Sequence, residues 1–171
     1  MKLPLKKGFV AVVAGIVLLS SHIEVANAGG MPSEQNVVLL AENENIQNYA
    51  QSVLDLVNIE RRKAGVKPLV LSDELMRAAA VRSQEITKVF SHTRPDGTAF
   101  SSLVSRHGRR IGENIAGGYQ TPEDVVDGWM HSEGHRKNIL HPDFTELGVG
   151  YAYEENSQYK HYWVQIFRRP M

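Results

Sequence analysis

The sequence predicts a domain of the α+β class. Segments with helical periodicity come first along the 171 residues, and two extended segments follow near the end of the chain. The extended segments, about Leu147–Tyr153 and Tyr159–Phe167, are separated by Asn156-Ser157, which is typical of a β-hairpin. Helices followed by a terminal hairpin indicate packing against an antiparallel sheet, because each element must bury its apolar face against another.

The N-terminus has the layout of a secretory signal peptide. Three lysines precede the apolar run Phe9–Leu19, and the small-x-small sequence Ala26-Asn27-Ala28 follows it. The alternative is an uncleaved membrane anchor, but the run is shorter than the roughly 20 residues that span a bilayer. We therefore expect three parts: a signal peptide (1–28), a flexible leader (29–45) and a folded domain (46–169).

Capping residues predict where the helices begin and end. The first helix should cover about Ile46–Ala64, with Gly65 as its C-cap. A second should begin after Ser72 and end near Val89, and a third should begin at Thr121-Pro122 and end at Gly134. Two shorter elements are expected between them, a helix over about Phe100–Arg106 and a strand or extended loop over Ile111–Ala116.

Composition and charge exclude several function classes. Without residues 1–28 the chain has 16 basic and 18 acidic residues, which gives no electrostatic basis for binding nucleic acid or an anionic membrane. We interpret the charged run Glu60–Lys63 as a solvated helix face. The chain has no cysteine, so disulfides, thiol catalysis and a lipid anchor on cysteine are excluded. The fold must be held by its core, which about 140 residues can provide.

Ionisable side chains occur in three segments: after the second predicted helix, in an extended segment between glycines, and after the end of the third predicted helix. The candidate site residues are His92, Glu113, Glu133 and His135. Polar groups in such positions can converge in a cleft. Two imidazoles with carboxylates suit either a divalent metal or an acid–base pair. The structural alternative is that the histidines are simply hydrogen-bonded and that Glu113 accepts backbone N–H bonds.

Other zinc and hydrolase motifs do not fit. In the metalloprotease helix a glutamate directly follows the first histidine, whereas Glu133 lies two positions after His131. At about 100° per residue, Glu133 would point away from the face that His131 shares with His135. The zinc site of deaminases needs cysteines, and no G-x-S-x-G motif supports a serine hydrolase.

Four ordered motifs resemble the CAP superfamily, which comprises the cysteine-rich secretory, antigen 5 and pathogenesis-related 1 proteins. The motifs are FSHTRPDG, GENIAGG, WMHSEGHRKNIL and FTELGVGY. The resemblance covers about residues 48–168 and is greatest to the bacterial SCP-like branch. It implies a three-layer α-β-α sandwich with a central, mainly antiparallel sheet.

The same resemblance implies a groove lined by two histidines and two acidic residues. His92 of FSH, Glu113 of GEN and His135 of GHR match family positions. The fourth position falls on Ser132, and the adjacent Glu133 is the alternative. His92 and His135 are the expected metal ligands, and zinc is the candidate cofactor.

The resemblance does not fix an activity, and three hypotheses follow. We favour a secreted binding or interaction module, located outside the cell or at its surface. Its groove would hold a metal or an unknown extracellular ligand, which is a small molecule, a lipid or a protein. The alternative is an extracellular metal-dependent or acid–base hydrolase, which the lack of an obvious nucleophile disfavours. The third hypothesis is a purely structural surface protein.

Overall fold

The computed structural model describes residues 34–105 and 108–171, which contain nine helices and strands. They are, in order, α1 (Glu34–Lys63), β1 (Val70–Leu71), α2 (Asp73–Lys88), the 3₁₀ helix η1 (Phe100–Leu103), β2 (Arg110–Gly117), α3 (Pro122–His131), α4 (Glu133–Ile139), β3 (Glu146–Tyr153) and β4 (His161–Arg169). The predicted signal peptide, 1–28, lies outside the described residues. None of the helices described is long and apolar enough to cross a membrane.

The strands form one four-stranded sheet in the order β1-β3-β4-β2. The predicted terminal hairpin is confirmed, because β3 pairs antiparallel with β4. Strand β2 pairs antiparallel with the other side of β4, and the two residues of β1 pair parallel with β3. The sheet is therefore mainly antiparallel, as expected.

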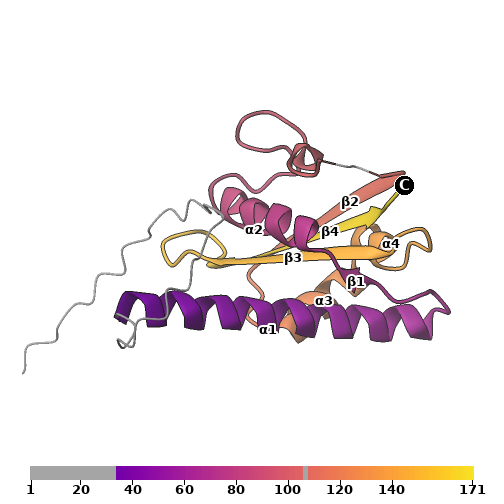
Figure 1. The fold of residues 1–171 in the computed structure, drawn as a ribbon, viewed down its shortest axis with the longest axis horizontal. Helices are drawn as coiled ribbons and strands as arrows, with labels where there is room; N and C mark the ends of the chain where they lie inside the picture. Colours follow the sequence, from indigo (N-terminus) through magenta and orange to yellow (C-terminus); the bar gives the residue numbers. More distant parts are fainter. Residues whose placement is uncertain (1–33, 106–107) are drawn as a thin grey trace, which may run out of the picture. The chain divides into compact units, whose positions relative to one another are not determined.

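Helices cover both faces of the sheet and complete a three-layer α-β-α sandwich. Helix α2 packs on one face, and α1 and α3 lie on the other (Figure 1). The alternation of side chains along β4 serves both layers. Trp163 and Phe167 belong to the hydrophobic cluster with α1 and α3, whereas Val164 and Ile166 belong to the cluster with α2.

Glycines bring α2 very close to the sheet. A Cβ atom at Gly148 would overlap the backbone of Leu75, and one at Gly150 would overlap the backbone of Ala79. Both glycines lie on β3 and face α2. The spacing of glycines in the GVG sequence therefore allows helix backbone to rest directly on strand backbone.

The first helix begins earlier than predicted. It starts at Glu34 and not at Ile46, so the leader expected over 29–45 is helical from Glu34 onward. Residues 34–45 contain no glycine or proline and include Leu39, Leu40 and Ala41, which favour helix. The prediction missed this part because it relied on an apolar stripe rather than on propensity.

The third helix ends three residues before Gly134, so the predicted stop was wrong. It ends at His131, and Ser132 is both its C-cap and the N-cap of α4. Serine is a preferred residue at the N-cap of a helix. Glu133, in the first turn of α4, interacts favourably with the helix dipole. The helix predicted over Phe100–Arg106 is likewise shorter, a single 3₁₀ segment over Phe100–Leu103.

Candidate functional site

The carboxylate of Glu113 is the centre of the candidate site. Glu113 lies on β2 and its side chain is fully buried. Its Oε1 accepts a hydrogen bond from Nε of Arg82 at 2.8 Å, and its Oε2 lies 2.7 Å from Nδ1 of His92. The side chain of His92 is 59% exposed. A buried carboxylate thus holds an accessible imidazole.

The next residue, Asn114, serves the second histidine. Adjacent strand residues face opposite sides of a sheet, so Asn114 points toward α4. Its Nδ2 donates to the backbone carbonyl of His135 at 3.1 Å and to Oε1 of Gln165 at 3.0 Å. Its Oδ1 accepts from Nδ2 of Asn138 at 2.9 Å. Consecutive residues of the GEN motif therefore hold the two segments that bear His92 and His135.

Arg82 belongs to the site, although the sequence did not suggest it. Its guanidinium is completely buried and contacts Glu113, Glu85 and the carbonyl of Ser91. Glu85 in turn binds Arg94 at 2.7 Å, which fastens the segment after His92. One signal was available: a charged residue lies on the apolar face of the second helix, where it must find partners.

The two imidazoles differ in their electrostatic surroundings. The hydrogen bond that Glu113 accepts from His92 raises the pKa of His92 above its ordinary value, despite partial burial. Burial lowers the pKa of His135, and the nearby charge of His92 lowers it further. The charges of the two rings therefore interact, and His135 favours its neutral form.

The other predicted groove residues, Ser132 and Glu133, are not hydrogen-bonded to this centre. Ser132 is half-buried at the α3–α4 junction, and Glu133 is exposed in the first turn of α4. Within the described residues, neither side chain is bonded to His92, Glu113 or His135. The fourth groove position, assigned to either residue, stays a prediction.

Comparison with known proteins agrees with this architecture. The model of the cysteine-rich secretory protein family, CAP, matches residues 54–167, which is more than half of the chain. The chain belongs to the CAP family. This confirms the resemblance predicted from the four motifs.

Two bacterial proteins are similar to this chain. The uncharacterized protein YkwD of Bacillus subtilis (strain 168) is 43% identical over 112 residues, which are 63% of this chain and 44% of the relative. The crystal structure of an extracellular SCP-domain protein from Bacillus anthracis str. Ames is 26% identical, with a TM-score of 0.63, over 82% of this chain and 45% of that chain. This chain thus spans less than half the length of both relatives.

A more distant structure supports the fold alone. An outer surface protein from Borrelia burgdorferi is 16% identical, with a TM-score of 0.59, over 82% of this chain and 97% of that chain. The fold is therefore shared with an extracellular SCP-domain protein and with an outer surface protein. The roles of residues in this domain are therefore inferred from its own geometry.

That geometry leaves two imidazoles for a metal. Both oxygens of Glu113 are already hydrogen-bonded, and Nδ1 of His92 is used toward Glu113. No group of three or more His, Asp or Glu side chains in residues 34–105 and 108–171 is arranged to hold a metal ion. Nε2 of His92 and the ring of His135 are the atoms that fit, so external ligands would have to complete the coordination.

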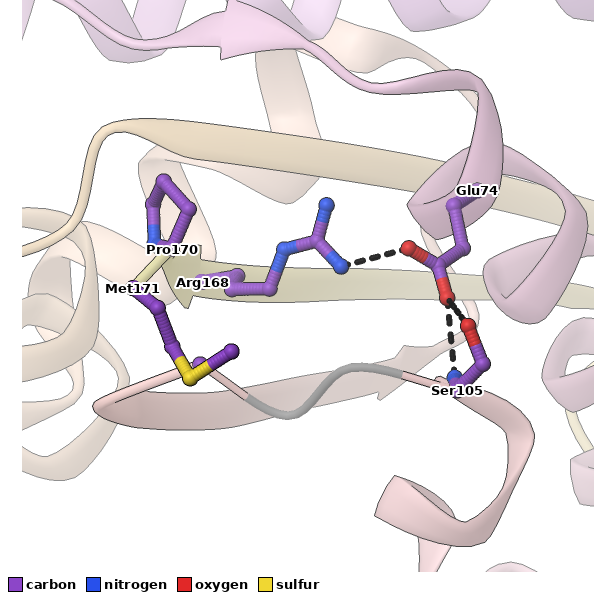
Figure 2. A pocket seen from close by; sticks show the side chains of 6 residues that line it. Glu74, Ser105, Arg168, Pro170 and Met171 are labelled. Carbon is purple, nitrogen blue, oxygen red and sulfur yellow. Dashed lines mark hydrogen bonds and ion pairs between the residues drawn. The ribbon is translucent and has the colours of Figure 1, made fainter.

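Two hollows elsewhere on the CAP domain contain no histidine in their linings. One lies between the start of α2 and the end of β4 (Figure 2). Its polar groups bind one another: Glu74 accepts from Arg168 and from both the backbone N–H and the hydroxyl of Ser105. We assign this hollow to structure rather than to ligand binding.

Proposed function

We propose that this CAP domain is an exported binding module in which His92 and His135 hold a divalent metal, with Zn²⁺ as the first candidate. The His92–Glu113 hydrogen bond is the observation that carries the proposal. A carboxylate that accepts from one ring nitrogen of a histidine leaves the other nitrogen to the metal, as in many metalloproteins. The buried carboxylate and exposed ring have this arrangement.

The electrostatics of the second histidine support the same proposal. A metal ligand must be unprotonated, and the lowered pKa of His135 favours that state. A zinc ion held by two imidazoles would keep positions open for a ligand from outside the domain. The groove is therefore proposed to recruit an extracellular small molecule, lipid or protein group that can complete the coordination.

A hydrolase is less well supported. The His92–Glu113 pair resembles a general base and the group that orients it, but a base must also reach a nucleophile. Within the described residues, His92 is hydrogen-bonded to Glu113 and to no hydroxyl group. We therefore propose binding rather than bond cleavage.

Calorimetry with Zn²⁺ tests the metal site. The protein should bind Zn²⁺ at about pH 7.5 and more tightly as the pH rises further, because the raised pKa of His92 makes protons compete with the metal. The variant His92→Ala should bind it more than about tenfold more weakly. The control His131→Ala removes an exposed histidine whose ring contacts Asp127 instead, and it should bind like the original protein. Equal binding by the protein and His92→Ala would disprove the site, provided that thermal melts show both folded.

Export is the second part of the proposal. The predicted signal peptide and the extracellular or surface location of CAP relatives both favour it. Intact-mass measurement of protein recovered from the culture medium should give a chain that begins at Gly29. A full-length chain retained in the membrane would contradict cleavage.

A further inference from the structure

The guanidinium of Arg82 connects both parts of the His92 environment. Its Nε donates to Oε1 of Glu113 at 2.8 Å, and its Nη2 donates to the carbonyl of Ser91 at 2.5 Å. Its Nη1 donates to Oε2 of Glu85 at 2.7 Å. One rigid, planar group on α2 thereby holds the carboxylate that binds the His92 ring and the backbone immediately before that residue.

Hydrogen-bond chemistry then determines the state of the ring. Arginine can only donate, so Oε1 of Glu113 is committed to Arg82 and Oε2 is left for His92. A carboxylate can only accept, so Nδ1 of the neutral imidazole must carry the hydrogen. Nε2 then keeps its lone pair and is the ring nitrogen left to bind a ligand.

We infer that Arg82 is a positioning residue: it holds the side chain at position 113 in the orientation through which that side chain sets the tautomer of His92. Simple charge neutralisation is the competing explanation, and any cation could provide it. A lysine ammonium is a compact point charge. It cannot reproduce the planar arrangement in which three guanidinium nitrogens donate separately to Glu113, Glu85 and the carbonyl of Ser91. The geometry of the guanidinium, and not only its charge, is therefore the property to test.

The variant Glu113→Gln gives the sharpest test because it leaves Arg82 in place. If Arg82 fixes the group at position 113, it will hold the amide oxygen, and the amide NH₂ will face His92. Nδ1 must then accept, so the neutral ring should change from the Nδ1–H to the Nε2–H tautomer. Nitrogen-15 NMR of the full chain, at a pH where His92 is neutral, reads this directly. A nitrogen–nitrogen coupling across the new N–H···N bond should accompany the change.

Retention of the Nδ1–H tautomer in Glu113→Gln would overturn the inference, because the amide would then have turned its oxygen toward His92. Absence of the nitrogen–nitrogen coupling would overturn it as well. Both outcomes would mean that Arg82 does not control the orientation at Glu113.

A second pair of variants separates geometry from charge. Arg82→Lys keeps the positive charge but not the planar guanidinium, so Glu113 should no longer be held against His92. The released ring should then show a mixture of tautomers in place of the single Nδ1–H form. Arg77→Lys is the matched control, because Arg77 is exposed on the same helix and is hydrogen-bonded to none of Glu113, Glu85 and Ser91. An unchanged tautomer in folded Arg82→Lys would overturn the inference. If that variant does not fold, Glu113→Gln decides the matter.

The link to metal binding rests on the proposed function. If the metal site is correct, both Glu113→Gln and Arg82→Lys should bind Zn²⁺ about 10–100-fold more weakly, and Arg77→Lys should not. If the original protein binds no Zn²⁺, the proposed function fails, while the tautomer measurement still decides the role of Arg82.

Discussion

Arg61 is a buried cation that is satisfied by carbonyl groups. It is completely buried. Its Nε donates to the backbone carbonyl of Lys67 at 2.7 Å. Its Nη1 donates to the backbone carbonyls of Ile139 at 2.6 Å and His141 at 3.0 Å. Its Nη2 donates to Phe144 at 2.9 Å. Burial lowers its pKa to about 10, still high enough to keep it charged at neutral pH. Arg61 thus joins the end of α1 to the segment that leads into β3.

Removal of Arg61 should destabilise the domain strongly. Arg61→Ala would leave several buried carbonyls without a donor, and each such loss costs about 1–3 kcal/mol, so we expect at least about 3 kcal/mol in total. The adjacent, exposed Arg62 is the matched control, and Arg62→Ala should stay within about 0.5 kcal/mol. Urea unfolding measures both. Similar midpoints for the two variants would contradict the structural role of Arg61.

The residues of the site were only partly predictable. His92, Glu113 and His135 were identified from their chemistry and motifs, but the partners that hold them were not. Arg82 lies 31 residues from Glu113, a pairing that only the packing of α2 on the sheet creates. The run Glu60–Lys63 was predicted to be a solvated face, and this was wrong for Arg61 because its carbonyl partners at Ile139 and Phe144 come from distant sequence.

At the scale of single elements, capping chemistry predicted the start of α3 but not its end, and it predicted the ends of α1 and α2. The start of α3 was correct: Thr121 Oγ1 accepts from the N–H of Asp124 at 3.1 Å, and proline follows it. The predicted stop at Gly134 failed because glycine can also lie inside a helix at modest cost. A new helix begins instead at Glu133, with Ser132 as its N-cap, although the Ser132 side chain makes no capping hydrogen bond.

Glycines at the contact between α2 and β3 should tolerate no side chain. Gly148→Ala would force a Cβ into the backbone of Leu75, so strand or helix must move. We expect a loss of about 3 kcal/mol or more, at the upper end of overpacking effects. Gly134→Ala in α4 is the control, because open space surrounds that position. Since alanine stabilises a helix by about 0.5–1 kcal/mol relative to glycine, this variant should not be destabilised. Thermal melts should separate the two variants, and a stable Gly148→Ala protein would contradict this packing.

At the scale of the whole molecule, the sequence predicted the layers but not the sheet order. Periodicity identified the hairpin, and the resemblance supplied the sandwich. The position of β2 beside β4 depends on pairings such as Asn114 with Gln165, which local pattern does not contain. Strand β1 pairs through only Val70 and Leu71, too short for any periodic signal.

Polar contacts around Arg168 join three distant parts of the chain. From β4, Arg168 binds Glu74 at 2.5 Å and Glu146 at 2.6 Å (Figure 2 shows the first). Glu74 also accepts from the N–H and hydroxyl of Ser105, at 2.8 and 2.6 Å. The start of α2, the segment after η1 and the last strand are therefore connected through one carboxylate.

This connection predicts how the domain responds to acid. The hydrogen bonds from Ser105, followed by those from Arg168, lower the pKa of Glu74 from 4.5 to about 2. A carboxyl whose folded-state pKa is depressed stabilises the fold above its unfolded value, and this stabilisation is lost as pH falls through the folded value. The protein should therefore lose stability between about pH 4.5 and pH 2 more steeply than Glu74→Gln does. Glu155→Gln, at an exposed position in the β3–β4 loop, should follow the original protein. Urea midpoints measured across this pH range give the slopes, and parallel curves for the protein and Glu74→Gln would show that Glu74 does not link folding to protonation.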